Sequence, residues 1–119
     1  MDDRIKVLIV DDSSDIRVLV SKICTRNGWD ASVSENGQEA IDVIKKDDSF
    51  SFIFMDIKMP IMDGIEAAKI IKELKPSIFI IALSADDKNK YVDDLGRYSP
   101  FDDFISKDEM DKIIKVIVN

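Results

Sequence analysis

Near its start the chain reads Val7-Leu8-Ile9-Val10-Asp11-Asp12, a short apolar run that ends in two carboxylates. Three later apolar runs also end at a polar group, at Asp56, Ser84 and Lys107. If the runs are parallel strands of one sheet, their carboxyl ends meet at one edge, where open α/β sheets bind ligands. That edge would then carry three carboxylates, a hydroxyl and an ammonium group.

Strand-like and helix-like segments alternate along the whole chain, and this alternation predicts a parallel sheet with helices on both faces. The 119 residues are long enough for one domain with one core, spanning residues 1–119. The predicted strands are Ile5–Val10, Asp30–Ser34, Phe52–Met55, Ile78–Leu83 and Asp103–Ser106. The predicted helices are five: one from Ser13 or Ser14 to Asn27-Gly28, then about Gln38–Lys46, Gly64–Leu74, Asp87–Leu95 and Glu109–Val118.

The strands differ in apolar content, and this difference predicts their order. In Asp30–Ser34 only Ala31 and Val33 alternate, and Asp103–Ser106 is short, so both suit the edges of the sheet. The three strongly apolar strands suit its centre, where both faces are covered. Counted along the chain, the order 2-1-3-4-5 with right-handed crossovers meets these conditions.

Apolar residues at helical spacing predict the buried face of each helix. The first three stripes are Ile16, Leu19, Val20, Ile23 and Cys24; Ala40, Ile41 and Ile44; and Ala67, Ile70, Ile71 and Leu74. Cys24 is the only cysteine, which excludes an internal disulfide. Its place in a stripe favours a small core residue over a redox group.

Composition narrows the class of function. The net charge of −7 argues against direct nucleic-acid binding, which needs clustered cations. No apolar stretch reaches the roughly 20 residues of a membrane span. Residues 1–4 lack the pattern of a signal peptide, so we expect a cytoplasmic protein without a membrane partner. The absence of histidine excludes histidine zinc sites, Ser-His-Asp triads and a phosphohistidine on this chain.

Three carboxylates at one edge repel one another, and a divalent cation would keep all of them ionised. Mg²⁺ prefers oxygen ligands and commonly takes one or two carboxylates together with waters. The candidate direct ligands are Asp12, Asp56 and the main-chain carbonyl of Lys58, while Asp11 could act through a water.

A metal at this edge suits phosphoryl chemistry, because it lets an anionic donor approach an anionic nucleophile. Asp56, alone at the end of a central strand, is the candidate nucleophile for an aspartyl phosphate. Lys107 would contact the phosphoryl group as a point charge, and Ser84 would donate a hydrogen bond to it. Plainer interpretations exist for each residue alone: loop or cap aspartates, a solvated lysine and a helix-capping serine.

These residues resemble the receiver domain of two-component response regulators, and the resemblance spans the whole chain and agrees with the strand order 2-1-3-4-5. The matching segments are Ile9-Val10-Asp11-Asp12, Met55-Asp56, Lys58-Met59-Pro60-Ile61-Met62-Asp63-Gly64, Ala82-Leu83-Ser84-Ala85 and Phe104-Ile105-Ser106-Lys107. The Met-Pro-x-Met-Asp-Gly segment is the most specific of them.

The resemblance implies a phosphoacceptor rather than an enzyme. Asp56 would accept phosphate from a partner histidine kinase or histidine phosphotransfer protein, with Mg²⁺ held by Asp11, Asp12 and Asp56. Phosphorylation from small donors and dephosphorylation would be its only self-catalysed reactions. Ser84 and Lys107 would engage the phosphoryl group. The side chain of Phe104 would turn inward as Ser84 moves, although a plain core aromatic is the alternative.

The resemblance also implies where the signal leaves the domain. A downstream target protein would bind the surface formed by residues 87–95, 103–106 and 109–118. The family usually has proline after the lysine at the end of the last strand, and here Asp108 follows Lys107. Lys58 and Asp86 are candidates for tuning the phosphoryl lifetime; the alternative is two solvated charges.

Two other classes of function compete with this one. A phosphorylation-independent interaction module on the same fold would be expected to lose the nucleophile or the acidic pair, and this chain keeps both. Among enzymes, a phosphatase with an aspartyl nucleophile would want a second aspartate where Lys58 stands. A flavin-binding protein would want a phosphate loop where Asp11-Asp12 would repel the phosphate.

Overall fold

The structure is a computed structural model that describes residues 4–85 and 99–108. Its strands are β1 (Lys6–Val10), β2 (Asp30–Ser34), β3 (Phe52–Asp56), β4 (Phe79–Ser84) and β5 (Asp103–Ser106). Its helices are α1 (Ser14–Arg26), α2 (Gly37–Lys46) and α3 (Gly64–Leu74). The helices predicted at about Asp87–Leu95 and Glu109–Val118, and the candidate Asp86, lie outside the described residues.

The five strands form one parallel sheet in the order β2-β1-β3-β4-β5, which confirms the predicted order. The weakly apolar β2 and the short β5 lie at the two edges, as their composition indicates. The register pairs Val10 with Met55, and Asp56 with Leu83. The carboxyl ends of β1, β3 and β4 therefore lie next to one another.

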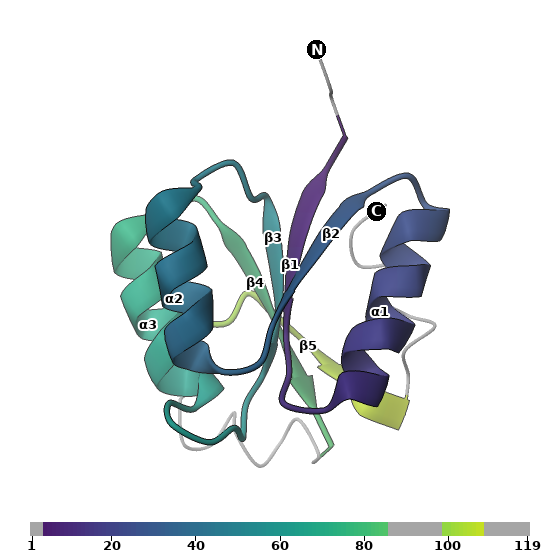
Figure 1. The fold of residues 1–119 in the computed structure, drawn as a ribbon. Helices are drawn as coiled ribbons and strands as arrows, with labels where there is room; N and C mark the ends of the chain where they lie inside the picture. The colour runs from purple at the N-terminus through teal and green to yellow at the C-terminus, as the bar shows by residue number, and fades with distance from the viewer. Residues whose placement is uncertain (1–3, 86–98, 109–119) are drawn as a thin grey trace.

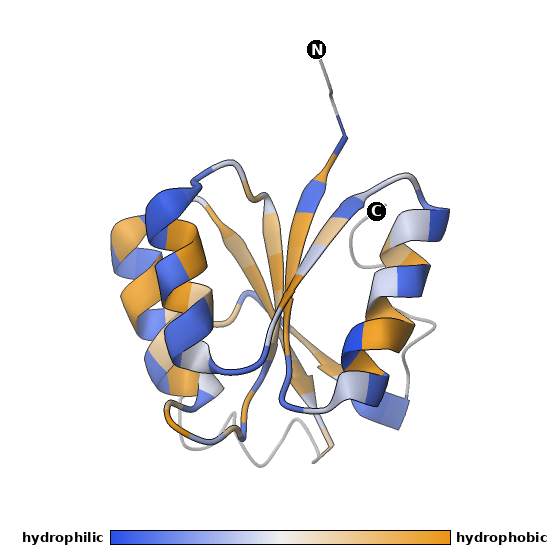
Figure 2. Ribbon diagram, viewed as in Figure 1, coloured by the Kyte–Doolittle hydropathy of each residue, from blue (hydrophilic) through white to orange (hydrophobic). Residues whose placement is uncertain are grey.

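Helices cover both faces of the sheet, with α1 on one face and α2 and α3 on the other (Figure 1). Each face has its own core. Val7, Ile9, Phe54 and Leu83 point toward α1, whereas Leu8, Ile53 and Met55 point toward α2 and α3. The central strands are apolar on both faces because both are covered (Figure 2).

A capping side chain marks the start of each described helix. The Ser13 hydroxyl accepts from the amide of Ile16 at 3.4 Å, and the Asn36 and Asp63 side chains accept from the amides of Glu39 and Glu66, each at 2.9 Å. Such caps satisfy amides that have no partner within the helix. All three helices begin beside the carboxyl ends of the strands, so the caps also fix the loops at that end of the sheet.

The predicted stripes are wrong at two residues. Leu19 is 44% exposed and Leu74 is 46% exposed, although both were expected in the core. Leu19 and Cys24 are about 140° apart around a helix, which exceeds the roughly 100° face that one layer can bury. Leu74 is the last residue of α3, where a groove between the ends of α2 and α3 leaves it open. Across residues 4–85 and 99–108, no helix has the length and apolar content to cross a bilayer.

Burial of Cys24 predicts a thiol that reports on unfolding. The side chain is fully buried between α1, to which it belongs, and the sheet, and burial raises the pKa of the thiol to about 11. Thiolate is the reactive form, so we expect native protein at pH 8 to react with an aromatic disulfide reagent far more slowly than urea-unfolded protein. Absorbance of the released thiol measures both rates, and equal rates would contradict the assigned packing of α1.

Candidate functional site

The predicted polar residues lie together at the carboxyl ends of four strands. Asp11 follows β1, Asp56 and Ser84 are the last residues of β3 and β4, and Lys107 follows β5. Carboxylate oxygens of Asp11, Asp12 and Asp56 all lie within 4.8 Å of one another. Asp11 and Asp56 are buried and Asp12 is exposed, so the cluster opens to solvent on one side.

Lys107 supplies positive charge to this cluster. Its Nζ lies 2.9 Å from Oδ2 of Asp11 and 3.3 Å from Oδ1 of Asp56. Burial alone would lower the pKa of Lys107, but its hydrogen bond to Asp11 and the charges of Asp56 and Asp11 outweigh this effect and raise it. Lys107 therefore stays an ammonium and holds the two buried carboxylates together.

The Lys107 ammonium by itself does not balance three carboxylates. Burial raises the pKa of Asp56 to about 7, and the charge of Asp11 adds to the rise while Lys107 opposes it. Oδ2 of Asp11 is buried, and it faces the Lys107 ammonium at 2.9 Å. An oxygen-rich cluster that is short of positive charge fits a hard divalent cation such as Mg²⁺.

A cavity of about 190 Å³ lies beside the cluster. Its lining includes Asp12, Asp56, Lys58, Ser84 and Lys107. Ser84 is buried and Lys58 is exposed, so the hydroxyl lies deep in the cavity and the second lysine stands at its rim. The structure thus gathers these predicted residues around Asp56, while Asp86 falls outside the part of the chain that it describes.

Phe104 occupies a different position. It is half-buried, packs against the α2 and α3 side of the core, and meets the ring of Phe101 edge-on at 5.6 Å between centroids. This packing is that of a core aromatic, and a switching role for Phe104 stays a prediction. The Lys107–Asp108 peptide bond is trans, as are the other described bonds.

Sequence reasoning missed the part that Gly64 plays in placing Asp56. A Cβ at Gly64 would lie 2.0 Å from the carbonyl oxygen of Asp56, and the Gly64 amide donates to the carbonyl of Ile57 at 2.7 Å. The start of α3 thus rests directly on the backbone of the Asp56 residue. The Asp63-Gly64 pair at the start of a helix was the available signal, since close backbone approach is one use of glycine.

The loop from β3 to α3 also contains a residue in an unusual conformation. Ile61 has a φ of 71° and is 82% exposed. The Met62 amide donates to the Pro60 carbonyl at 2.7 Å, which closes a three-residue turn around Ile61. The Gly37 amide reaches the Met62 carbonyl at 3.3 Å, so the loop is also held by the start of α2.

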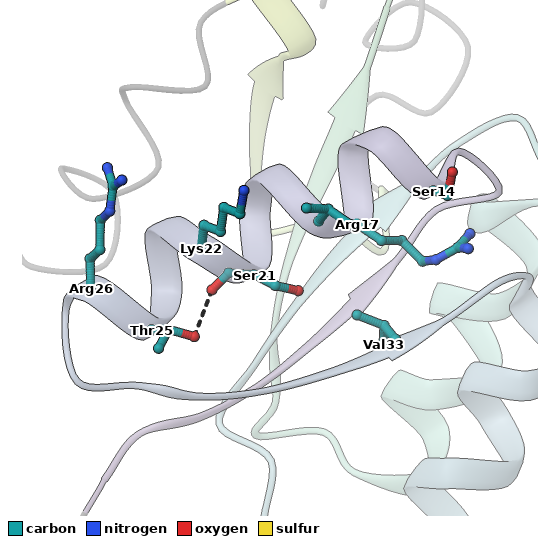
Figure 3. A pocket seen from close by; sticks show the side chains of 8 residues that line it. Ser14, Arg17, Ser21, Lys22, Thr25, Arg26 and Val33 are labelled. Carbon is teal, nitrogen blue, oxygen red and sulfur yellow. Dashed lines mark hydrogen bonds between the residues drawn. The ribbon is translucent and has the colours of Figure 1, made fainter.

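A second hollow, of about 570 Å³, lies between α1 and β2 (Figure 3). Its walls include the apolar Val18 and Val33 and the basic Arg17, Lys22 and Arg26. Val33, expected among the alternating apolar residues of β2, is exposed here because β2 is an edge strand. Among residues 4–85 and 99–108 the lining contains no carboxylate, so Asp11, Asp12 and Asp56 do not border this hollow.

Comparison with known proteins gives a consistent result. A family model described as the response regulator receiver domain matches residues 7–118. The chemotaxis protein CheY of Bacillus subtilis is 33% identical over 113 residues, which cover 94% of this chain and 93% of that protein. The hybrid signal transduction histidine kinase E of Dictyostelium discoideum is 39% identical over 93 residues, 74% of this chain. The match spans only 6% of that kinase.

A solved structure agrees with these relatives. The response regulator TrrA of Thermotoga maritima, solved in complex with Mg²⁺-BeF, superposes with a TM-score of 0.81 at 29% identity. The superposition covers 94% of this chain and 97% of TrrA.

Contact between Gly64 and Asp56 predicts a large cost for a single methyl group. We expect Gly64→Ala to lower the free energy of unfolding by about 3 kcal/mol, because the new Cβ must push the Asp56 backbone aside. Gly28→Ala is the matched control: Gly28 has a φ of 78° but open space around it, so only the conformational cost of about 1 kcal/mol applies. Urea unfolding measures both, and equal losses would refute the close contact.

Proposed function

The chain belongs to the response regulator receiver domain family of two-component signalling, and we propose that Asp56 is its phosphoacceptor. The convergence of Asp11, Asp12 and Asp56 within 4.8 Å carries this proposal. Asp56 is the carboxylate of the three that is both buried and part of the cavity lining. The family match over residues 7–118 supports treating residues 1–119 as one receiver domain.

Receiver domains bind Mg²⁺ at their acidic pocket. In this chain we propose the carboxylates of Asp11, Asp12 and Asp56 and the main-chain carbonyl of Lys58 as the groups that hold it. When bound, Mg²⁺ supplies charge neutralisation to the carboxylates and to the incoming phosphoryl group. The close approach of the three carboxylates and the raised pKa of Asp56 support a site that is short of positive charge.

The proposed reaction is transfer from a phosphohistidine. A carboxylate oxygen of Asp56 bonds to phosphorus as the P–N bond breaks, and the leaving imidazole takes a proton from water. Lys107, already 3.3 Å from Asp56, would contact the phosphoryl oxygens, and the Ser84 hydroxyl would donate to one of them. The signal ends when water attacks phosphorus and the P–O bond to Asp56 breaks, which releases inorganic phosphate.

Receiver domains pair with histidine kinases or phosphotransfer proteins and act as phosphoacceptors. The chain has no histidine, which is consistent with a donor histidine on another segment or protein. We propose such a donor here, together with a cytoplasmic location, which is typical of the family. We further propose that phosphorylation repositions Ser84 and Phe104 and alters the surface around β5, where a downstream target binds.

Phosphorylation from a small donor tests the central proposal. Incubation with acetyl phosphate and Mg²⁺ should add one phosphoryl group, measured by intact mass. Asp56→Asn should add none, because an amide is not a nucleophile here, and EDTA should abolish the gain in the native chain. Labelling of Asp56→Asn to the same extent would refute Asp56 as the acceptor, and an unlabelled native chain would favour the phosphorylation-independent module.

Lys58, at the rim of the cavity, and Asp86, two residues after Ser84 in the sequence, allow a second test. Lys58→Ala and Asp86→Ala are expected to change the rate of phosphate loss after acetyl phosphate is removed, because we propose that both charges steer the water that attacks the aspartyl phosphate. Lys45→Ala, on the exposed face of α2, serves as a control that removes a lysine far from this edge. If both variants lose phosphate at the native rate, Lys58 and Asp86 are plain solvated charges.

A further inference from the structure

Arg17, on the first turns of α1, connects three segments at the acidic edge. Its Nη1 donates to the carbonyl oxygen of Asp11 at 2.8 Å, and its Nη2 lies 3.6 Å from Oε1 of Glu35. The side chain is only 16% exposed, although arginine is among the residues least often buried. In Figure 3 it runs from α1 toward the end of β2, away from the directions taken by Lys22 and Arg26.

The group that Arg17 holds is the peptide that joins the two aspartates. The carbonyl of Asp11 belongs to the Asp11–Asp12 peptide unit, so fixing that oxygen fixes the plane from which Asp12 departs. Other contacts fix the rest of Asp11. Its amide donates to the Ser34 carbonyl at 3.2 Å, and its Oδ1 accepts from the Ser13 amide at 2.9 Å. Asp12 is exposed and depends on this peptide for its placement.

We propose that Arg17 is a positioning residue that sets the Mg²⁺ affinity of the cluster by fixing the Asp11–Asp12 peptide. This inference rests on the proposed magnesium site. The guanidinium orients the peptide between two of the ligands without itself touching the metal. Its positive charge also lies next to the backbone of Asp11, one of three carboxylates that repel one another.

The planar fork of arginine suits this role better than a lysine ammonium. One guanidinium nitrogen donates to the Asp11 carbonyl and another faces the Glu35 carboxylate, and these two residues lie on different loops. Lysine concentrates its charge on a single flexible nitrogen and lacks this fixed pair of donors. Glu35 is largely exposed, so the carbonyl contact is the one expected to matter for the metal.

Mg²⁺ binding measured by isothermal titration calorimetry tests the proposal. Arg17→Gln should raise the dissociation constant for Mg²⁺ about tenfold, the lower end of what outer partners of metal ligands contribute. Arg17→Lys keeps the charge and should raise it less. Arg26→Gln removes the same charge from the other end of α1 and should leave it unchanged. In Arg17→Gln, the rate of labelling by acetyl phosphate should fall strongly below the native rate at low Mg²⁺, and much less at saturating Mg²⁺.

Urea unfolding without Mg²⁺ separates positioning from mere stability. A lowered free energy of unfolding with unchanged Mg²⁺ affinity in the Arg17 variants would overturn the inference. If Arg17→Gln does not fold, Arg17→Lys decides: a raised dissociation constant supports the inference, and the native value overturns it. Absence of Mg²⁺ binding by the native chain would instead overturn the proposed function.

Discussion

Electrostatic repulsion among Asp11, Asp12 and Asp56 is the constraint on which this edge of the molecule depends. Three carboxylates whose oxygens approach within 4.8 Å would separate if nothing held them. The sheet prevents this, because Asp11 and Asp56 stand at the ends of adjacent central strands whose register is fixed by two apolar cores. Lys107 forms ion pairs with both buried carboxylates, so the residue after β5 is linked electrostatically to the ends of β1 and β3.

Much of this arrangement could be predicted from sequence because it follows from short-range patterns. Apolar runs of four to six residues set the strands, and their uneven polarity set the order. Since parallel strands end at the same edge, the meeting of Asp11, Asp56, Ser84 and Lys107 followed from the order alone. The exposure of Val33 and Leu19 was harder to predict. Periodicity shows which side of a strand or helix faces the core, but not how far the neighbouring elements cover that side.

Contacts between distant segments could not be predicted in the same way. The approach of Gly64 to Asp56 depends on the path of the loop between them, and the path depends on a turn at Ile61 that the local sequence does not favour. Arg17 looks like one more surface cation of an amphipathic helix. Only the placement of the β1–α1 and β2–α2 loops reveals that its guanidinium lies between them. Such contacts leave no periodic pattern in the sequence from which they could be predicted.

The turn at Ile61 has a consequence for how much stability the domain can gain. A β-branched side chain at a positive φ is disfavoured by about 1–3 kcal/mol, and this side chain recovers little by packing because solvent surrounds it. Glycine or asparagine would adopt the same backbone more readily. The present sequence therefore leaves a margin for thermostabilisation at a single solvent-facing position, one that an inspection of the hydrophobic interior would overlook.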